Sequence, residues 1–117
     1  MSCLFKSLSH FVSGMNENLL RHIICDFLEK NPVMFDNVSV DNVINWRDNT
    51  NINDYIRNMR FTNTWGSALE ISAFCNIFNS KVILHHNGRE IEFLPNNPNP
   101  RYVCNIIYTG NHYEPKI

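Results

Sequence analysis

Hydrophobic residues recur every three or four positions through the first quarter of the chain. In the segment CLFKSLSHFV (3–12) they stand at positions 4, 5, 8, 11 and 12. This spacing places them on one face of a helix, which we expect to end at Gly14. In the segment 16–31 a wider apolar stripe runs from Leu19 to Leu28, with Asn16 as the helix cap and Asn31 before a proline at its end. The pattern predicts two amphipathic helices.

The middle of the chain alternates between polar and strongly apolar segments. Residues 35–50 are polar and rich in asparagine, and we expect a short helix around 40–46. The segment NDYIRNMR (53–60) is typical of another short helix. From Gly66 to Phe78 the apolar residues return at helical spacing, which predicts a buried helix opened by Trp65 and Gly66.

The hydrophobic period changes after residue 80. The runs KVILHH (81–86) and REIEFL (89–94) are strand-like, and Asn87-Gly88 between them is a strong hairpin signal. A proline-broken loop (95–100) leads to the strand YVCNIIY (102–108), and HYE (112–114) follows a turn. Helices first and strands second predict one α+β domain over 1–117, with helices packed on a small, mostly antiparallel sheet.

Composition excludes several classes of partner. The formal net charge of the 117 residues is −1, and the basic residues are scattered. We therefore expect no nucleic acid and no anionic membrane as the main partner. No apolar run approaches the roughly 20 residues that span a bilayer, and the start lacks a signal-peptide pattern, so we expect a cytoplasmic protein.

The four cysteines show no metal-ligand spacing, so we expect reduced thiols, no metal and no cofactor.

Cys3 and His112 are the residues with the clearest chemical potential. Cys3 would sit in the first turn of its helix, where backbone N–H groups and the helix dipole favour a thiolate; the alternatives are a packing residue or a loose terminus. His112 and Glu114 are two positions apart, so in a strand they share a face and the carboxylate can orient the imidazole. The alternative for His112 is a polar residue at a strand edge.

The other cysteines and histidines are explained by structure alone. The positions within apolar helical faces, which we assign to the core, are Cys25 and Cys75. Cys104 lies in a strand and receives no role. The remaining histidines are assigned to the surface, at His10, His22, His85 and His86. Trp65 either packs on the body or shapes the wall of a cleft.

Three segments, in order, resemble blocks of the ovarian-tumour (OTU) family of cysteine proteases, the deubiquitinases. CLFKSLSHFVSGMNENLLRHIICDFLEKN resembles the family's nucleophile block, usually Asp-Gly-Asn-Cys-Leu-Phe-Arg-Ser and a helix containing Leu-Arg. YIRNMRFTNTWGSALEISAFCNIFNSKVIL resembles its Tyr…Met…Thr-Trp-Gly…Glu-Leu…Ala stretch. IIYTGNHYEPKI resembles its last strand, which ends in His-Tyr and an acid or amide.

The resemblance implies a papain-type cysteine protease fold and a role for each matching residue. Cys3 matches the nucleophile and His112 the general base. Glu114 stands where many members carry the third residue of the triad. Trp65 matches a tryptophan near the active centre, and Ser2 stands beside the nucleophile where asparagine is usual. The implied substrate is ubiquitin or a ubiquitin-like modifier held by an isopeptide bond, and the implied form is a monomer.

One departure from the family pattern separates two hypotheses. Only Met1 and Ser2 precede Cys3, so the family's Asp-Gly is missing. We expect either a fragment of a longer protein or a protein that lacks this loop, with weakened or no activity. The first hypothesis is an active deubiquitinase; the alternative is a catalytically impaired domain that binds ubiquitin or another partner. A third is an unrelated α+β domain. The small size and many asparagines point to a compact viral member acting in the host cytoplasm.

Overall fold

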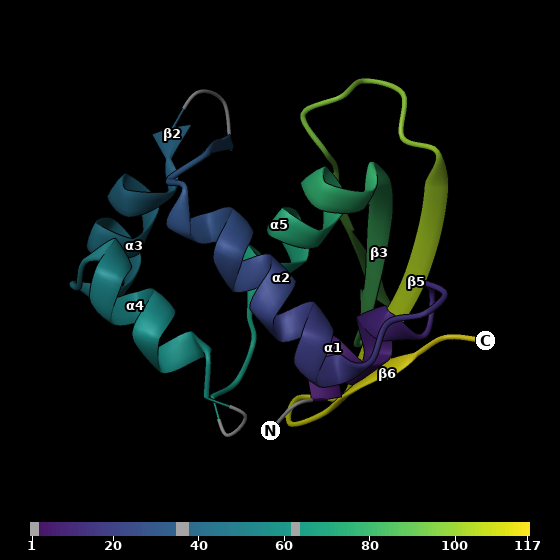
Figure 1. Cartoon of the computed structure of the whole chain (residues 1–117). Coiled ribbons are helices and arrows are strands. Elements are labelled where there is room, and N and C mark those ends of the chain that lie inside the picture. The colour runs from purple at the N-terminus through teal and green to yellow at the C-terminus, as the bar shows by residue number, and fades with distance from the viewer. Residues whose placement is uncertain (1–2, 35–37, 62–63) are drawn as a thin grey trace.

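Helices come first along the chain and the main strands come last (Figure 1). The computed structural model describes residues 3–34, 38–61 and 64–117. Its helices are α1 (Cys3–Ser9), α2 (Glu17–Glu29), α3 (Val40–Asp48), α4 (Ile52–Met59) and α5 (Ala68–Phe78). Its strands are β1 (Val33–Met34), β2 (Val38–Ser39), β3 (Ser80–His86), β4 (Arg89–Phe93), β5 (Tyr102–Tyr108) and β6 (Tyr113–Pro115). The α+β class predicted from the pattern is confirmed.

Two of the predicted helix boundaries are wrong, and one predicted cap is confirmed. The Asn16 side chain accepts a hydrogen bond from the backbone N–H of Leu19 at 2.8 Å, as expected of a cap. The first helix ends at Ser9 and not at Gly14, because the following residues make tight i to i+3 turns. The third apolar helix begins at Ala68 after its cap Ser67, so Gly66 lies outside it.

The main sheet has the strand order β4-β3-β5-β6. A two-residue turn at Asn87 and Gly88, both with positive φ, joins β3 to β4 as an antiparallel hairpin. The β5–β6 pair is also antiparallel, whereas β3 and β5 run parallel with Val82 opposite Cys104. Two of the three pairings are therefore antiparallel. The short β1–β2 ladder was not predicted, because each of its strands has only two residues.

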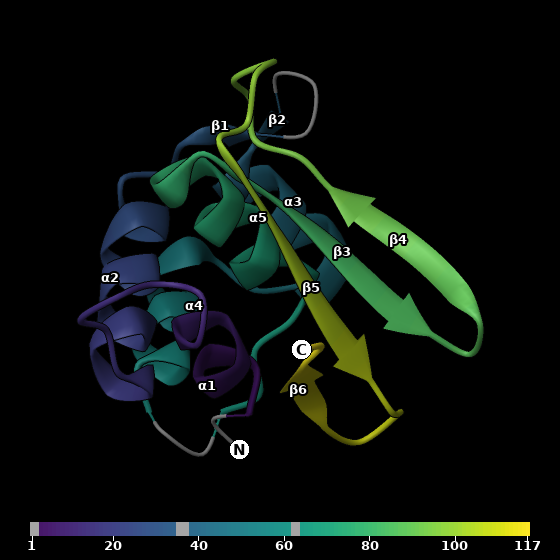
Figure 2. The ribbon, with the colours of Figure 1, turned by 90° about the vertical axis from the view of Figure 1, so that its right-hand side faces the viewer.

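The helices form a layer against one face of the main sheet (Figures 1 and 2). α5 packs on β3, and α2 packs on α1, α4 and α5. Alternate residues of β3 and β5 point into this layer, so Val82, Cys104 and Ile106 are buried. Within the described ranges, no helix is long and apolar enough to cross a membrane.

Candidate active site

The N-terminal helix and the C-terminal strand meet at Cys3. The backbone N–H of Tyr113 donates to the Cys3 sulfur at 3.5 Å, although 110 positions separate the two residues. A hollow of about 230 Å³ lies at this junction. It is lined by Cys3, Lys6, Ser7, His10, His112, Tyr113, Glu114 and Pro115. The fold thus brings together the cysteine, the histidine and the carboxylate that the sequence singled out.

Packing in the core determines where α1 places the thiol. A helix of seven residues is marginal by itself, so α1 depends on its buried Leu4 and Phe5. The buried Arg21 guanidinium lies 4.2 Å from the centre of the Phe5 ring. Arg21 also donates to the backbone oxygens of Met59 and Thr64, at 2.8 and 2.9 Å. Arg21 therefore joins α1 to the segment that leads towards α5.

A buried carboxylate fixes the start of α5. Glu70 accepts hydrogen bonds from the Ser67 N–H at 2.8 Å, the Ser67 hydroxyl at 2.9 Å and the Tyr55 hydroxyl at 2.6 Å. Burial raises the pKa of Glu70, while the donors from Tyr55 and Ser67 oppose that rise. Gly66, next to this cap, lies against Leu4 of α1. Sequence reasoning missed Glu70, although its spacing from Ser67 is that of a capping box.

The proposed base and its partner lie on the open side of the hollow. His112 and Glu114 are both exposed, His112 directly before β6 and Glu114 within it. In the described part of the chain, no hydrogen bond or ion pair joins their side chains. Trp65 is 44% exposed and is not among the residues that line the hollow. Ser2 lies outside the described residues.

Sequence reasoning missed three residues of α1 and the turn after it that line the hollow. Lys6, Ser7 and His10 follow Cys3 at the spacings of three, four and seven that define one helix face. The Ser7 hydroxyl donates to the Cys3 backbone oxygen at 2.7 Å. The helical period from Cys3 is the signal that identifies them, because it applies to the polar face of the helix as well as to the apolar one.

The other three cysteines differ from Cys3 in their burial. All four thiols are free, and Cys3 is half-buried while Cys25, Cys75 and Cys104 are buried. Burial raises the pKa of Cys25 and of Cys75 to about 12, and it also raises the pKa of Cys104. The assignment of Cys25 and Cys75 to the core is confirmed. Neutral buried thiols are poor nucleophiles, so chemistry is expected at Cys3.

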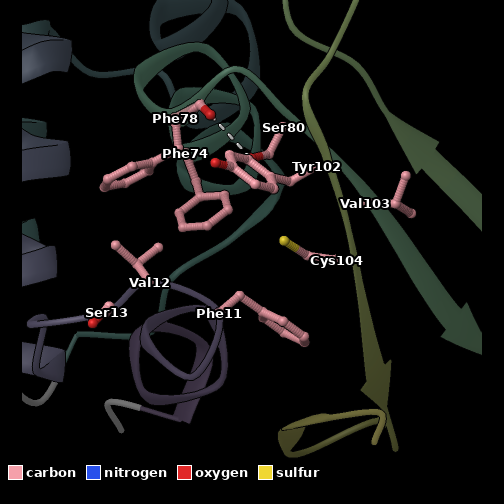
Figure 3. A pocket seen from close by; sticks show the side chains of 9 residues that line it. All are labelled: Phe11, Val12, Ser13, Phe74, Phe78, Ser80, Tyr102, Val103 and Cys104. Carbon is pink, nitrogen blue, oxygen red and sulfur yellow. Dashed lines mark hydrogen bonds between the residues drawn. The ribbon is translucent and has the colours of Figure 1, made fainter.

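A second, larger hollow lies between α5, β5 and the turn after α1 (Figure 3). Its volume is about 390 Å³, and the sulfur of Cys104 points towards the space between Phe11, Phe74 and Tyr102. No histidine or carboxylate is among its lining residues. Despite its size it lacks a base for a thiol, so the smaller hollow at Cys3 is the candidate active site.

The assignment of His85 and His86 to the surface is wrong. Both are half-buried, because each contacts β5 across the sheet. His85 Nε2 lies 2.9 Å from the Asn105 side-chain oxygen, and His86 Nδ1 lies 2.8 Å from the Tyr108 backbone oxygen.

Among the described residues, no group of three or more His, Cys, Asp or Glu side chains is placed to hold a metal ion.

Comparisons with known proteins agree with this architecture. The family model described as OTU-like cysteine protease matches residues 2–113. No curated protein sequence matches the chain. Among solved structures, an ovarian-tumour (OTU) domain in complex with ubiquitin superposes with a TM-score of 0.74 at 18% identity. That alignment covers 97% of this chain and 62% of the solved chain, so this chain spans less than two thirds of that relative.

Two further structures share the fold. An OTU deubiquitinase from Wolbachia pipientis wMel bound to ubiquitin gives a TM-score of 0.70 at 19% identity, over 99% of this chain and 89% of that one. The viral OTU domain protease from Dera Ghazi Khan virus gives 0.68 at 20% identity, over 97% and 72%. Because the family model matches nearly the whole sequence and these structures share its fold, the chain belongs to the family of OTU-like cysteine proteases.

Proposed function

We propose that this chain is a cysteine-dependent deubiquitinase that hydrolyses isopeptide bonds at the C-terminus of ubiquitin or a ubiquitin-like modifier. The observation that carries the proposal is the common hollow of Cys3, His112 and Glu114 in a member of the OTU-like family. Similar structures bound to ubiquitin support this class of substrate. In the proposed roles, Cys3 is the nucleophile, His112 the base and Glu114 the group that orients the imidazole.

The reaction begins with proton transfer from the Cys3 thiol to His112. The thiolate attacks the carbonyl carbon of the modifier's C-terminal glycine and forms a tetrahedral intermediate. The bond to the lysine nitrogen breaks as His112 returns its proton to the leaving amine, which leaves a thioester on Cys3. Water, deprotonated by His112, attacks the thioester; the carboxylate of the modifier is released and the thiol re-forms.

The backbone contact at the sulfur fits the first step. The Tyr113 N–H points at Cys3 from β6, directly after the proposed base. A donor in this place stabilises negative charge that develops on the sulfur, at no cost in reorganisation. Because His112 and Tyr113 are adjacent, the same turn that delivers the imidazole also delivers this donor.

Cleavage of isopeptide-linked diubiquitin by the 117-residue chain tests the proposal. We expect cleavage by the wild type, none by Cys3→Ala or His112→Ala, and a loss of at least about 10-fold for Glu114→Gln. His22→Ala, on the exposed side of α2, is the control and should keep the wild-type rate. Wild-type cleavage that survives Cys3→Ala would overturn the assignment of the nucleophile.

One observation favours a second function, the binding of ubiquitin without cleavage. Among the described residues, His112 and Glu114 are not joined by a hydrogen bond, and both are exposed. A triad that stays open when substrate is bound would hold the modifier without reacting. Under this alternative, ubiquitin binds the wild type and Cys3→Ala with the same affinity, and neither protein cleaves diubiquitin.

A further inference from the structure

Three aromatic rings on adjacent strands form a row that ends beside Cys3. The centroids of the His86 and Tyr108 rings are 5.1 Å apart, and those of Tyr108 and Tyr113 are 4.7 Å apart. Tyr108 and Tyr113 are direct partners in the β5–β6 register. His86 is on β3, the other neighbour of β5. Rings at these separations attract each other and hold one another in place.

Tyr108 also holds the turn that carries His112. Its hydroxyl donates to the Gly110 backbone oxygen at 2.7 Å. On the other side of the turn, Thr109 donates to the His112 backbone oxygen, from its N–H at 2.9 Å and from its hydroxyl at 3.2 Å. The turn between β5 and β6 (Figure 2) is therefore closed by Thr109 and fixed against the sheet by Tyr108.

The shape of this turn sets the positions of two groups that line the hollow at Cys3. His112 is its last residue, and the next residue, Tyr113, donates its N–H to the Cys3 sulfur. Tyr108 itself is not among the residues that line the hollow. Any effect of Tyr108 on Cys3 is therefore indirect, and the contacts that lead towards Cys3 are its bond to the turn and its ring contact with Tyr113.

We propose that Tyr108 is a positioning residue for the Cys3–His112 site, acting through its hydroxyl bond to the turn and its ring contact with Tyr113. The inference rests on the proposed function for its meaning in catalysis. What Tyr108 changes is the reactivity of Cys3, which can be measured without ubiquitin. Loss of the hydroxyl loosens the turn, so the Tyr113 N–H stays less at the sulfur and the His112 imidazole reaches the sulfur less often.

The test is the rate at which iodoacetamide alkylates Cys3 as a function of pH, read by mass spectrometry of the Cys3 peptide. The variants are Tyr108→Phe, which keeps the ring, and His112→Ala. The control is Tyr102→Phe, on the same strand but 58% exposed and lining the other hollow. In addition to Cys3 and His112, the titratable groups that line the hollow are Lys6, His10, Tyr113 and Glu114. The His86 ring contacts Tyr108 from the side of β3. None of these groups is changed in Tyr108→Phe or Tyr102→Phe.

We expect Tyr108→Phe to unfold in urea close to wild type and to alkylate roughly 2- to 10-fold more slowly at pH 7. Its pH profile should move towards that of His112→Ala, while Tyr102→Phe superposes on wild type. With ubiquitin carrying a C-terminal electrophile, the maximal rate of adduct formation should fall by the same factor at unchanged half-saturation.

Two results would overturn the inference: a Tyr108→Phe profile that superposes on wild type, or a wild-type profile that does not change in His112→Ala. A profile that depends on both residues, without any ubiquitin adduct, supports the inference and contradicts the proposed function. An adduct that forms equally fast in wild type and Tyr108→Phe supports the function and contradicts the inference.

Discussion

The close approach of Gly66 to α1 makes Gly66→Ala an informative substitution. A Cβ at this position would lie 2.5 Å from Leu4 Cδ2 and 3.2 and 3.3 Å from two atoms of the Phe5 ring. The first distance is far inside van der Waals contact. Leu4 and Phe5 are 1% and 0% exposed, so neither side chain can turn away into solvent.

The expected cost follows from this packing. One extra methyl group in a filled core typically costs about 1–3 kcal/mol, because side chains or backbone must shift. Here the element that has to move is α1, which carries Cys3. We therefore expect a loss of about 1–3 kcal/mol in the free energy of unfolding, and a fall in the rate at Cys3 of up to about 100-fold.

Urea unfolding of a double-mutant cycle isolates this contact. Leu4→Ala alone should cost about 2–5 kcal/mol as a cavity. In Gly66→Ala/Leu4→Ala the shortest clash is gone, so the double variant should be more stable than the sum of the single changes predicts, by about 1 kcal/mol or more. Strict additivity, or a Gly66→Ala protein as stable as wild type, would show that a side chain at position 66 does not clash with Leu4.

Three further predictions concern the cysteines and the buried Arg21. Burial raises the pKa of Cys25 from 9.0 to about 12, so the neutral thiol contributes fully to stability below pH 9. This contribution is lost as the pH rises towards 12. We therefore expect the free energy of unfolding to fall between these two pH values. At pH 8, iodoacetamide should add one group to the folded protein, at Cys3, and four in urea; modification of Cys25 in the folded protein would contradict this. Arg21→Lys keeps the charge but loses the planar stack on Phe5, so we expect a loss of about 1–3 kcal/mol by urea unfolding. Arg57→Lys, at an exposed side chain, is the control and should lie within about 0.5 kcal/mol of wild type; equal values for the two variants would contradict the role of Arg21.

Local patterns predicted the elements, because hydrophobic period, caps and turn residues act between neighbours in the sequence. The segment 102–108 became β5 with unchanged bounds, and Asn87-Gly88 made the expected hairpin turn. The parallel pairing of β3 with β5 could not be read from the pattern, since strand order depends on contacts between distant segments. The end of α1 was misplaced because apolar residues at helical spacing continue past it into turns.

The candidate site depended on a different kind of information. Nothing in the spacing of residues near Cys3 or His112 says that the two ends of the chain meet. The resemblance to a family supplied that expectation, and in the structure the Tyr113 N–H contacts the Cys3 sulfur. The buried Arg21 was missed because a charged residue within a helical pattern is normally placed in solvent.

In the proposed function, Cys3 and His112 act together on the C-terminus of ubiquitin or a related modifier. Incubation of the 117-residue chain with ubiquitin carrying a C-terminal electrophile tests it most directly. We predict a covalent adduct on Cys3 that is lost in Cys3→Ala and strongly slowed in His112→Ala. The same incubation is repeated with a version in which Asp-Gly-Asn directly precedes Cys3. The absence of an adduct from both proteins would contradict the proposed function and leave a domain that binds without cleaving.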